Sequence, residues 1–202
     1  MFSILFLACL YFSLYLSFRT VQTVNDLLQG LLVKVEREKD PSLKAVFLLN
    51  NINHILKGIS TGTVEEAVGP KFAQVVKKLT KYIADQKESL KETWGTAIKA
   101  ATLDDPSQVD SVTKKTYVKK KFSTFNEEVQ RLCALQKKLL IADVTVRDDV
   151  RGIIIAAVVP VYSAFVDRYD AVQFTANRAK YFVYTPDTLR MAINELFEGS
   201  SE

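Results

Sequence analysis

A cluster of basic side chains is the strongest chemical signal in the sequence. Five lysines fall within the eight residues 114–121, with no acid among them: Lys114, Lys115, Lys119, Lys120 and Lys121. Each basic residue held near an anionic bilayer contributes on the order of 1 kcal/mol, and salt weakens the attraction. The cluster therefore predicts weak, salt-sensitive adhesion to an anionic surface, which needs a second signal for stable attachment.

These lysines have two other interpretations besides membrane binding. A run of like charges can also be a solvated helix face, and this alternative stays open. Nucleic acid is another polyanion, but the nearby aromatic residues fall at core spacing rather than between the lysines, and no recognition motif accompanies them. We therefore expect no nucleic-acid partner. The net charge of the 202-residue chain is only +4, so attraction to any anion depends on local clustering.

Other residue types that carry chemistry are scarce. The chain has one histidine, His54, and two cysteines, Cys9 and Cys133, which excludes most histidine-based catalysis and a disulfide framework. The sequence contains no Gly-rich phosphate loop, nucleophile elbow or zinc-binding helix motif. The acidic pair Asp148 and Asp149 lies at an expected helix start, where carboxylates complement the helix dipole. We therefore expect no enzyme, no metal site and no cofactor.

Helices must position the lysines. Glycine and proline are scarce, at 7 and 5 residues, and apolar residues recur every three or four positions, which is typical of helices with one buried face. Asp40–Pro41, Asp105–Pro106 and Thr185–Pro186 are typical of helix starts, and Thr63 and Thr145 resemble the first residues of capping boxes. We expect an all-α fold, an elongated stack of antiparallel helical bundles.

The last long helix has an apolar stripe that predicts its buried face. The residues of this stripe are Val146, Val150, Ile153, Ala157, Val161 and Phe165. The capping signal at Thr145 indicates where the helix begins. Proline lacks a backbone donor and crowds the carbonyl four residues earlier, so we expect Pro160 to interrupt this helix.

The sequence divides into three segments. Residues 1–18 carry no charged side chain and would reach about 27 Å as a helix, close to the thickness of a bilayer's hydrocarbon core. A transmembrane or signal-like segment, a buried bundle helix and a gene-model remnant are the alternatives for it. The basic residues that follow favour a cytosolic location for the rest of the chain. A loop-like stretch at 103–110 predicts a boundary between a helical bundle at 19–103 and a C-terminal helical bundle at 104–202.

Four stretches of the sequence resemble a known family, the 70-kDa subunit of the exocyst, which tethers secretory vesicles to the plasma membrane. They occur in the family's order and spacing: DPSLKAVFLLNNINHILKGI at 40–59, KKKFSTFNEEVQRL at 119–132, RDDVRGIIIAAVVPVYSAFVDRY at 147–169 and KYFVYTPDTLRMAINELFEG at 180–199. The resemblance covers the chain from about residue 21 to residue 199. It therefore implies that this chain corresponds to the C-terminal part of a helical rod.

The resemblance also implies a function. Members of the family bind phosphatidylinositol 4,5-bisphosphate through basic residues of the C-terminal subdomain, at the cytosolic face of the plasma membrane. Lys119 and Lys121 match basic positions of the family, whereas Ser123 stands where many members are basic. Other exocyst subunits are the implied partners, with small GTPases as further candidates. We expect a vesicle-tethering subunit, and the alternative is a helical protein-interaction scaffold that does not bind lipid.

Overall fold

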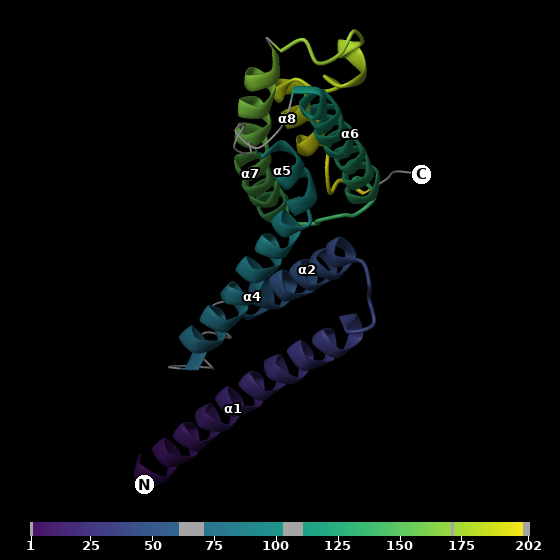
Figure 1. The fold of residues 1–202 in the computed structure, drawn as a ribbon. Coiled ribbons are helices and arrows are strands. Elements are labelled where there is room, and N and C mark those ends of the chain that lie inside the picture. Colours follow the sequence, from purple (N-terminus) through teal and green to yellow (C-terminus); the bar gives the residue numbers. More distant parts are fainter. Residues whose placement is uncertain (1, 61–70, 103–110, 171, 200–202) are drawn as a thin grey trace. The chain divides into compact units, whose positions relative to one another are not determined.

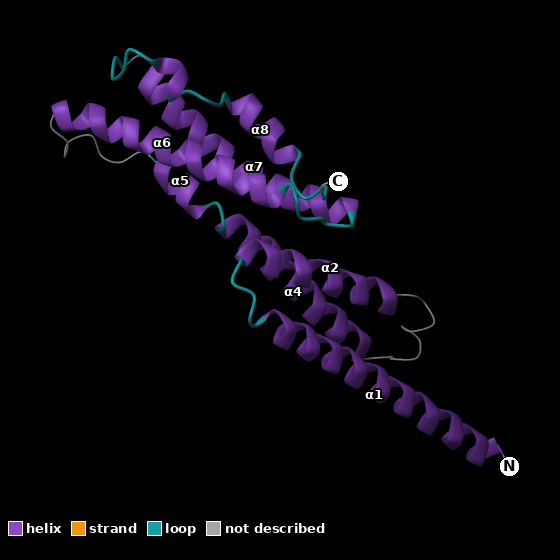
Figure 2. Cartoon of the chain, turned by 90° about the vertical axis from the view of Figure 1, so that its right-hand side faces the viewer, coloured by secondary structure: helices purple, strands orange, loops and turns teal. Residues whose placement is uncertain are grey.

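The computed structural model describes residues 2–60, 71–102, 111–170 and 172–199; the side chains of 2–14, 16 and 111–114 are not part of that description. Within these ranges the regular elements are helices (Figure 2), which confirms the predicted all-α class. The helix start predicted at Asp105–Pro106 and the capping box predicted at Thr63 fall outside the described residues.

The chain forms two compact units, Met1–Lys87 and Glu88–Glu202. The division lies inside α4 (Phe72–Glu92), earlier than the boundary expected at 103–104. The reason is packing, because Leu90 and Trp94 are fully buried and the indole Nε1 of Trp94 donates to Gln136 Oε1 at 3.1 Å. This contact joins the end of α4 to the elements of unit 2.

Unit 1 contains the hairpin of α1 (Phe2–Val35) and α2 (Pro41–Ile59), with the first part of α4 beside it (Figure 1). The predicted start of α2 is confirmed, since the Asp40 carboxylate accepts a hydrogen bond from Leu43 N at 2.9 Å and Pro41 occupies the first turn. Lys78 Nζ donates to Asn25 Oδ1 at 2.8 Å, which links α4 to α1.

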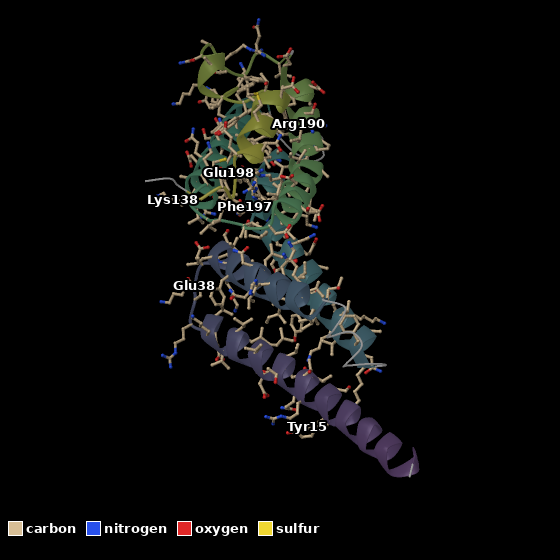
Figure 3. All side chains as sticks on the ribbon, turned by 180° about the vertical axis from the view of Figure 1, so that it is seen from behind. Tyr15, Glu38, Lys138, Arg190, Phe197 and Glu198 are labelled. Carbon is tan, nitrogen blue, oxygen red and sulfur yellow. The ribbon has the colours of Figure 1, made fainter. Side chains whose placement is uncertain are left out.

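Residues 2–18 of the apolar N-terminal segment belong to α1, and the helix continues without a break to Val35. Tyr15 is 51% exposed and lies on the side of α1 turned away from α2 and α4 (Figure 3). Phe18 is 58% exposed, whereas Ser17 and Val24 are buried. Membrane insertion of residues 1–18 stays a prediction.

Unit 2 contains the end of α4 together with α5 (Gly95–Ala101), α6 (Ser111–Gln136), α7 (Val144–Asp170) and α8 (Pro186–Asn194). The helix start predicted at Thr185 is confirmed, because the Thr185 hydroxyl accepts from Thr188 N at 3.1 Å. The apolar face of α6 is fully buried and consists of Val118, Phe122, Phe125, Val129 and Leu132. Helix α5 packs against both α6 and α7, and α8 packs against α7.

The start and the continuity of α7 differ from the prediction. The capping box predicted at Thr145 is wrong: the helix begins at Val144, and Asp143 Oδ1 accepts from Val146 N at 3.0 Å. The predicted interruption is also wrong, since α7 continues through Pro160 to Asp170. Proline at this position removes one backbone donor, but the apolar face of the helix is held by packing on both sides of it.

The buried face of α7 is rotated relative to the predicted stripe. The fully buried positions in its central turns are Ile154, Val158 and Tyr162, whereas Ile153, Ala157 and Val161 are only half-buried. Within the described residues α7 is the one helix long and apolar enough to cross a bilayer by length and composition. Core packing accounts for that composition, because α7 supplies nine buried residues to unit 2.

The segment after α8 forms a C-terminal latch, residues Leu196–Gly199, against the turn that joins α6 to α7. Phe197 N donates to Gln136 O, Ile141 N donates to Phe197 O and Gly199 N donates to Leu139 O, each at 3.0 Å. Phe197 is fully buried, and its φ of 61° lies in the left-handed region. Figure 3 shows Phe197 and Glu198 side by side on this segment. The latch thus fixes the chain end by backbone bonds and by one aromatic anchor.

A buried arginine of α7 holds the latch from the other side. Arg151 is 8% exposed, and its Nε donates to Leu196 O at 2.9 Å while Nη2 also donates to that carbonyl. The same guanidinium pairs with Glu198 at 2.7 Å, and Arg147 pairs with the second oxygen of that carboxylate at 3.1 Å. The hydrogen bond from Arg151 and the two positive charges hold the pKa of Glu198 below its usual range.

Candidate functional site

The predicted lysine cluster lies in the first turns of α6, where the helix separates its members. A helix turns about 100° per residue, so side chains four positions apart stay together. Val118 and Phe122 point into the core of unit 2. Lys115 and Lys119 lie one turn apart on one flank of this buried face; Lys115 is exposed and Lys119 is half-buried. These two lysines therefore project from the same flank of α6.

The other lysines of the cluster have different surroundings. Lys121 Nζ donates to Thr102 O at 2.6 Å and lies 5.1 Å from the centre of the Tyr117 ring, so it is tied to the opposite flank of α6. Lys120 is exposed on the outer face. The side chain of Lys114 lies outside the description. Of the four predicted lysines whose side chains are described, the structure thus brings two to the same flank of α6.

A hollow of about 700 Å³ lies beside Lys115 and Lys119. Its other lining residues come from the connection between α7 and α8, and they are Gln173, Phe174, Thr175, Ala176 and Arg178. Figures 1 and 2 show this connection at the same end of the unit as the start of α6. We call these residues, with Lys115 and Lys119, the basic hollow.

Arg178 opens a short 3-10 turn, Arg178–Lys180, and is held from two sides. Its Nη1 donates to Asp170 O at 2.6 Å, and its Nη2 pairs with the Asp170 carboxylate. Its guanidinium carbon lies 4.4 Å from the centre of the Phe182 ring. These contacts orient a planar, permanently charged group at the edge of the basic hollow.

An aromatic cluster fixes the connection against α6. Phe122 lies 4.4 Å from Phe165, 5.5 Å from Phe174 and 4.8 Å from Phe182, measured between ring centres. Phe174 is 3% exposed, so the residue between Gln173 and Thr175 is anchored in the core. The buried amide of Asn126 adds a hydrogen bond from Nδ2 to Tyr181 O at 2.9 Å. Core packing of α6 and α7 therefore determines where Arg178 lies.

The charge of the basic hollow suits an anion. Two lysines and one arginine line it, and among the described residues the carboxylate paired with one of these cations is that of Asp170. Phosphate and carboxylate groups are the anions that such donors bind best, since arginine can present two parallel N–H groups and lysine a compact charge. Among the described residues no group of three or more His, Cys, Asp or Glu side chains could hold a metal ion.

The sequence prediction missed Arg178 as a member of this site. It lies in NRAKYF, residues 177–182, where two basic residues are followed by two aromatic ones. Basic residues next to aromatic residues in a polar connection were the available signal. The partner of this motif is a helix almost sixty residues earlier in the chain, so the distance to Lys119 could not be read from spacing.

Comparison with known proteins explains the four recognised stretches. The family model for the C-terminal part of the Exo70 exocyst complex subunit matches residues 13–195. Exocyst complex component 7 of Drosophila melanogaster is 26% identical over 185 residues, which are 89% of this chain and 27% of that protein. The human protein of the same name is 28% identical over 185 residues, which are 89% of this chain and 25% of that protein.

A solved structure of Saccharomyces cerevisiae Exo70 shares the fold, with a TM-score of 0.63 at 22% identity. The match covers 81% of this chain and 29% of the yeast chain. The chain thus spans less than a third of the length of the relatives that it matches. Because the family model covers most of the chain, the predicted resemblance is confirmed: this chain belongs to the Exo70 family of exocyst subunits and corresponds to the C-terminal part of that family.

Proposed function

We propose that this chain serves as the C-terminal part of an exocyst subunit that helps to tether secretory vesicles to the plasma membrane in exocytosis. In this role it binds phosphatidylinositol 4,5-bisphosphate at the cytosolic face of that membrane and assembles with other exocyst subunits. Small GTPases are further candidate partners. Family membership supports the tethering role, and the relatives named above are exocyst components.

The basic hollow is the observation that carries the lipid-binding part of the proposal. Lys115 and Lys119 share a flank of α6, and Arg178 lines the same hollow. Lys120 is exposed on the outer face of α6, next to Lys119 in the sequence, and can add attraction to the headgroups of a nearby bilayer. Lys121 contributes less, because its ammonium group is bonded to Thr102 O. Among the predicted lysines whose side chains are described, Lys115 and Lys119 therefore carry most of the binding.

The expected strength of binding follows from the number of charges. Each basic side chain near an anionic surface contributes on the order of 1 kcal/mol, so the basic hollow supports weak attachment that salt reverses. Replacing two of its cations with acids removes two attractive charges and adds two repulsive ones. Such a change should lower vesicle binding more than tenfold, since about 1.4 kcal/mol corresponds to a factor of ten.

The test uses the double variant Lys115→Glu and Lys119→Glu. Sedimentation with phosphatidylcholine vesicles that contain phosphatidylinositol 4,5-bisphosphate should fall to the level seen with phosphatidylcholine alone. The matched control is Lys77→Glu with Lys81→Glu, an exposed pair with the same spacing on α4. The control variant changes the net charge by the same amount and should keep most of the binding.

Two results would contradict the lipid-binding proposal. One is unchanged vesicle binding in the Lys115 and Lys119 variant, provided that its helical circular dichroism matches that of the wild type. The other is an equal loss in both double variants, which would mean that net charge rather than the basic hollow drives adhesion.

A helical interaction scaffold that does not bind lipid is the second candidate function. The pairing of Arg178 with Asp170 favours it, because that carboxylate offsets part of the charge of the hollow. Binding of purified exocyst subunits together with no vesicle binding by the wild type would select this function over the first.

A further inference from the structure

A hollow of about 450 Å³ opens between α1 and α2 within unit 1. On the α1 side it is lined by Thr20, Thr23 and Leu27, and on the α2 side by Ile55, Gly58 and Ile59. Arg19 and His54 line it as well. We call this hollow and its continuation described below the α1–α2 groove.

Small residues leave the groove unfilled. A Cβ atom placed on Gly58 would meet nothing within 4 Å, so a larger side chain has room there. Thr20 and Thr23 are short as well. As a result Leu27 is 50% exposed, and Ile55 and Ile59 are only half-buried. Apolar surface of this kind on a helix pair is typical of a site that a partner covers.

The groove continues along the same two helices. A second hollow of about 200 Å³ is lined by Lys34, Leu43, Lys44 and Phe47, together with Val35 and Glu38. Lys44 lies eleven residues, or about three turns, before Ile55, and Phe47 lies eleven residues before Gly58. The two hollows therefore share one face of α2. From Arg19 to Lys34 the groove extends about 22 Å, the length of a helix of four turns.

The charges along the groove are mostly positive. Arg19, Lys34 and Lys44 line it, and Glu38 is the one acid among the residues that line the two hollows. The carboxylate of Glu38 already accepts a hydrogen bond from Asp40 N at 2.8 Å in its own turn. A partner that matches this surface needs apolar side chains in the middle and acids at its sides.

We propose that the α1–α2 groove binds an amphipathic helix of a partner protein. The apolar stripe of that helix packs on Leu27, Ile55 and the open surface at Gly58, and its flanking aspartates or glutamates face Arg19, Lys34 and Lys44. This is the helix-in-groove mode of recognition, in which anchors at i, i+3, i+4 and i+7 supply the contact area. The groove lies in unit 1 and the basic hollow lies in unit 2, so neither proposal depends on the other.

The probe is a synthetic amphipathic peptide of about 15 residues with a leucine stripe flanked by glutamates. Its twin carries lysines in place of the glutamates. Each peptide carries a fluorescent label, and its binding to the full chain is followed by fluorescence anisotropy. The chain should bind the acidic peptide at least about tenfold more tightly than the basic one. Added salt should reduce this difference, because exposed charges are screened.

The variant Gly58→Leu fills the groove without removing any core contact. Leucine has a higher helix propensity than glycine, so the variant should fold at least as well as the wild type. It should weaken binding of the acidic peptide about tenfold or more. Gly152→Leu is the matched control, because Gly152 is also helical and exposed, would also meet nothing within 4 Å of an added Cβ atom, and lies on α7 in unit 2, where it lines neither hollow. The control should bind as the wild type does.

Three outcomes would overturn the proposal. The first is binding of neither peptide, and the second is equal binding of both. The third is an unchanged affinity for the acidic peptide in Gly58→Leu. Analytical ultracentrifugation tests one further case. If the wild type forms a dimer that Gly58→Leu dissociates, a second copy of this chain occupies the groove. That result would also overturn the proposal that the groove binds a helix of a different protein.

Discussion

At its C-terminal end α6 is tied to several other segments, whereas its N-terminal turns hold lysines in three different environments. Gln136 is fully buried; its Oε1 accepts from Trp94 Nε1 and its Nε2 donates to Thr93 Oγ1 at 3.0 Å. Its backbone carbonyl accepts from Phe197 in the C-terminal latch. At the other end Lys115 and Lys120 are exposed.

The difference separates stability from binding along one helix. Buried polar groups that are all bonded fix a single arrangement, because leaving one of them unpaired costs about 1–3 kcal/mol. Exposed lysines contribute little to the folded state, but they remain available to an anion. We therefore expect substitutions at the latch to change the free energy of unfolding, and substitutions at the lysine end to change binding alone.

The largest effect is expected from Phe197→Ala. Removing a fully buried phenylalanine costs about 3–5 kcal/mol, and urea unfolding should show this loss. Phe197→Gly is the control for backbone conformation, because glycine adopts the observed φ of 61° without the penalty of about 1–2 kcal/mol that other residues meet. The glycine variant should therefore be the more stable of the two, and the reverse order would mean that the latch does not hold this conformation in solution.

A smaller effect is expected from Arg151→Met. The substitution keeps the length of the aliphatic stem but removes both donors to Leu196 O, so it should lower the free energy of unfolding by about 1–3 kcal/mol. Arg168→Met, at an exposed position of the same helix, should cost less than about 0.5 kcal/mol. Equal stability losses in the two variants would mean that Arg151 at the latch stabilises the fold no more than an exposed arginine does.

The fold class and two of the helix starts could be predicted from the sequence, because their causes are local. The caps at Asp40 and Thr185 depend on residues within one helical turn, and both are confirmed. The buried face of α7 could not be assigned correctly, because most residues from 153 to 162 are apolar and several faces satisfy the same spacing. The hydroxyl of Tyr162, which donates to Tyr184 O at 2.8 Å, shows how a distant contact selects one face.

The candidate site was predicted in part for the same reason. The clustering of lysines in the sequence indicated Lys115 and Lys119, but it did not show that the turn of the helix separates Lys121 from them. Arg178 reaches the basic hollow only because Phe174 and Phe182 pack on Phe122. That packing is long-range, so no pattern within the lysine segment could have indicated it.

The smallest expected effect concerns the acid dependence of the latch. The pKa of Glu198 is lowered by its hydrogen bond from Arg151 and by the charges of Arg147 and Arg151. A carboxyl group whose pKa is lower in the folded than in the unfolded chain binds fewer protons when the chain is folded. Its stabilising contribution is therefore present above the ordinary glutamate pKa of about 4.3, and it is lost as the pH falls through the pKa of the folded state. Glu198→Gln should therefore be less stable than the wild type at neutral pH, and the gap should narrow in acid.

The measurement is the urea midpoint of the wild type and of Glu198→Gln, from neutral pH down to below the ordinary glutamate pKa. Lys119→Met is the matched control. Because the lysine variant removes no carboxylate, its difference from the wild type should stay constant as the pH falls. A gap between Glu198→Gln and the wild type that stays constant as well would show that the carboxylate does not titrate against the arginines. The stability that the latch provides would then not depend on pH, and the contrast between the two ends of α6 would rest on packing alone.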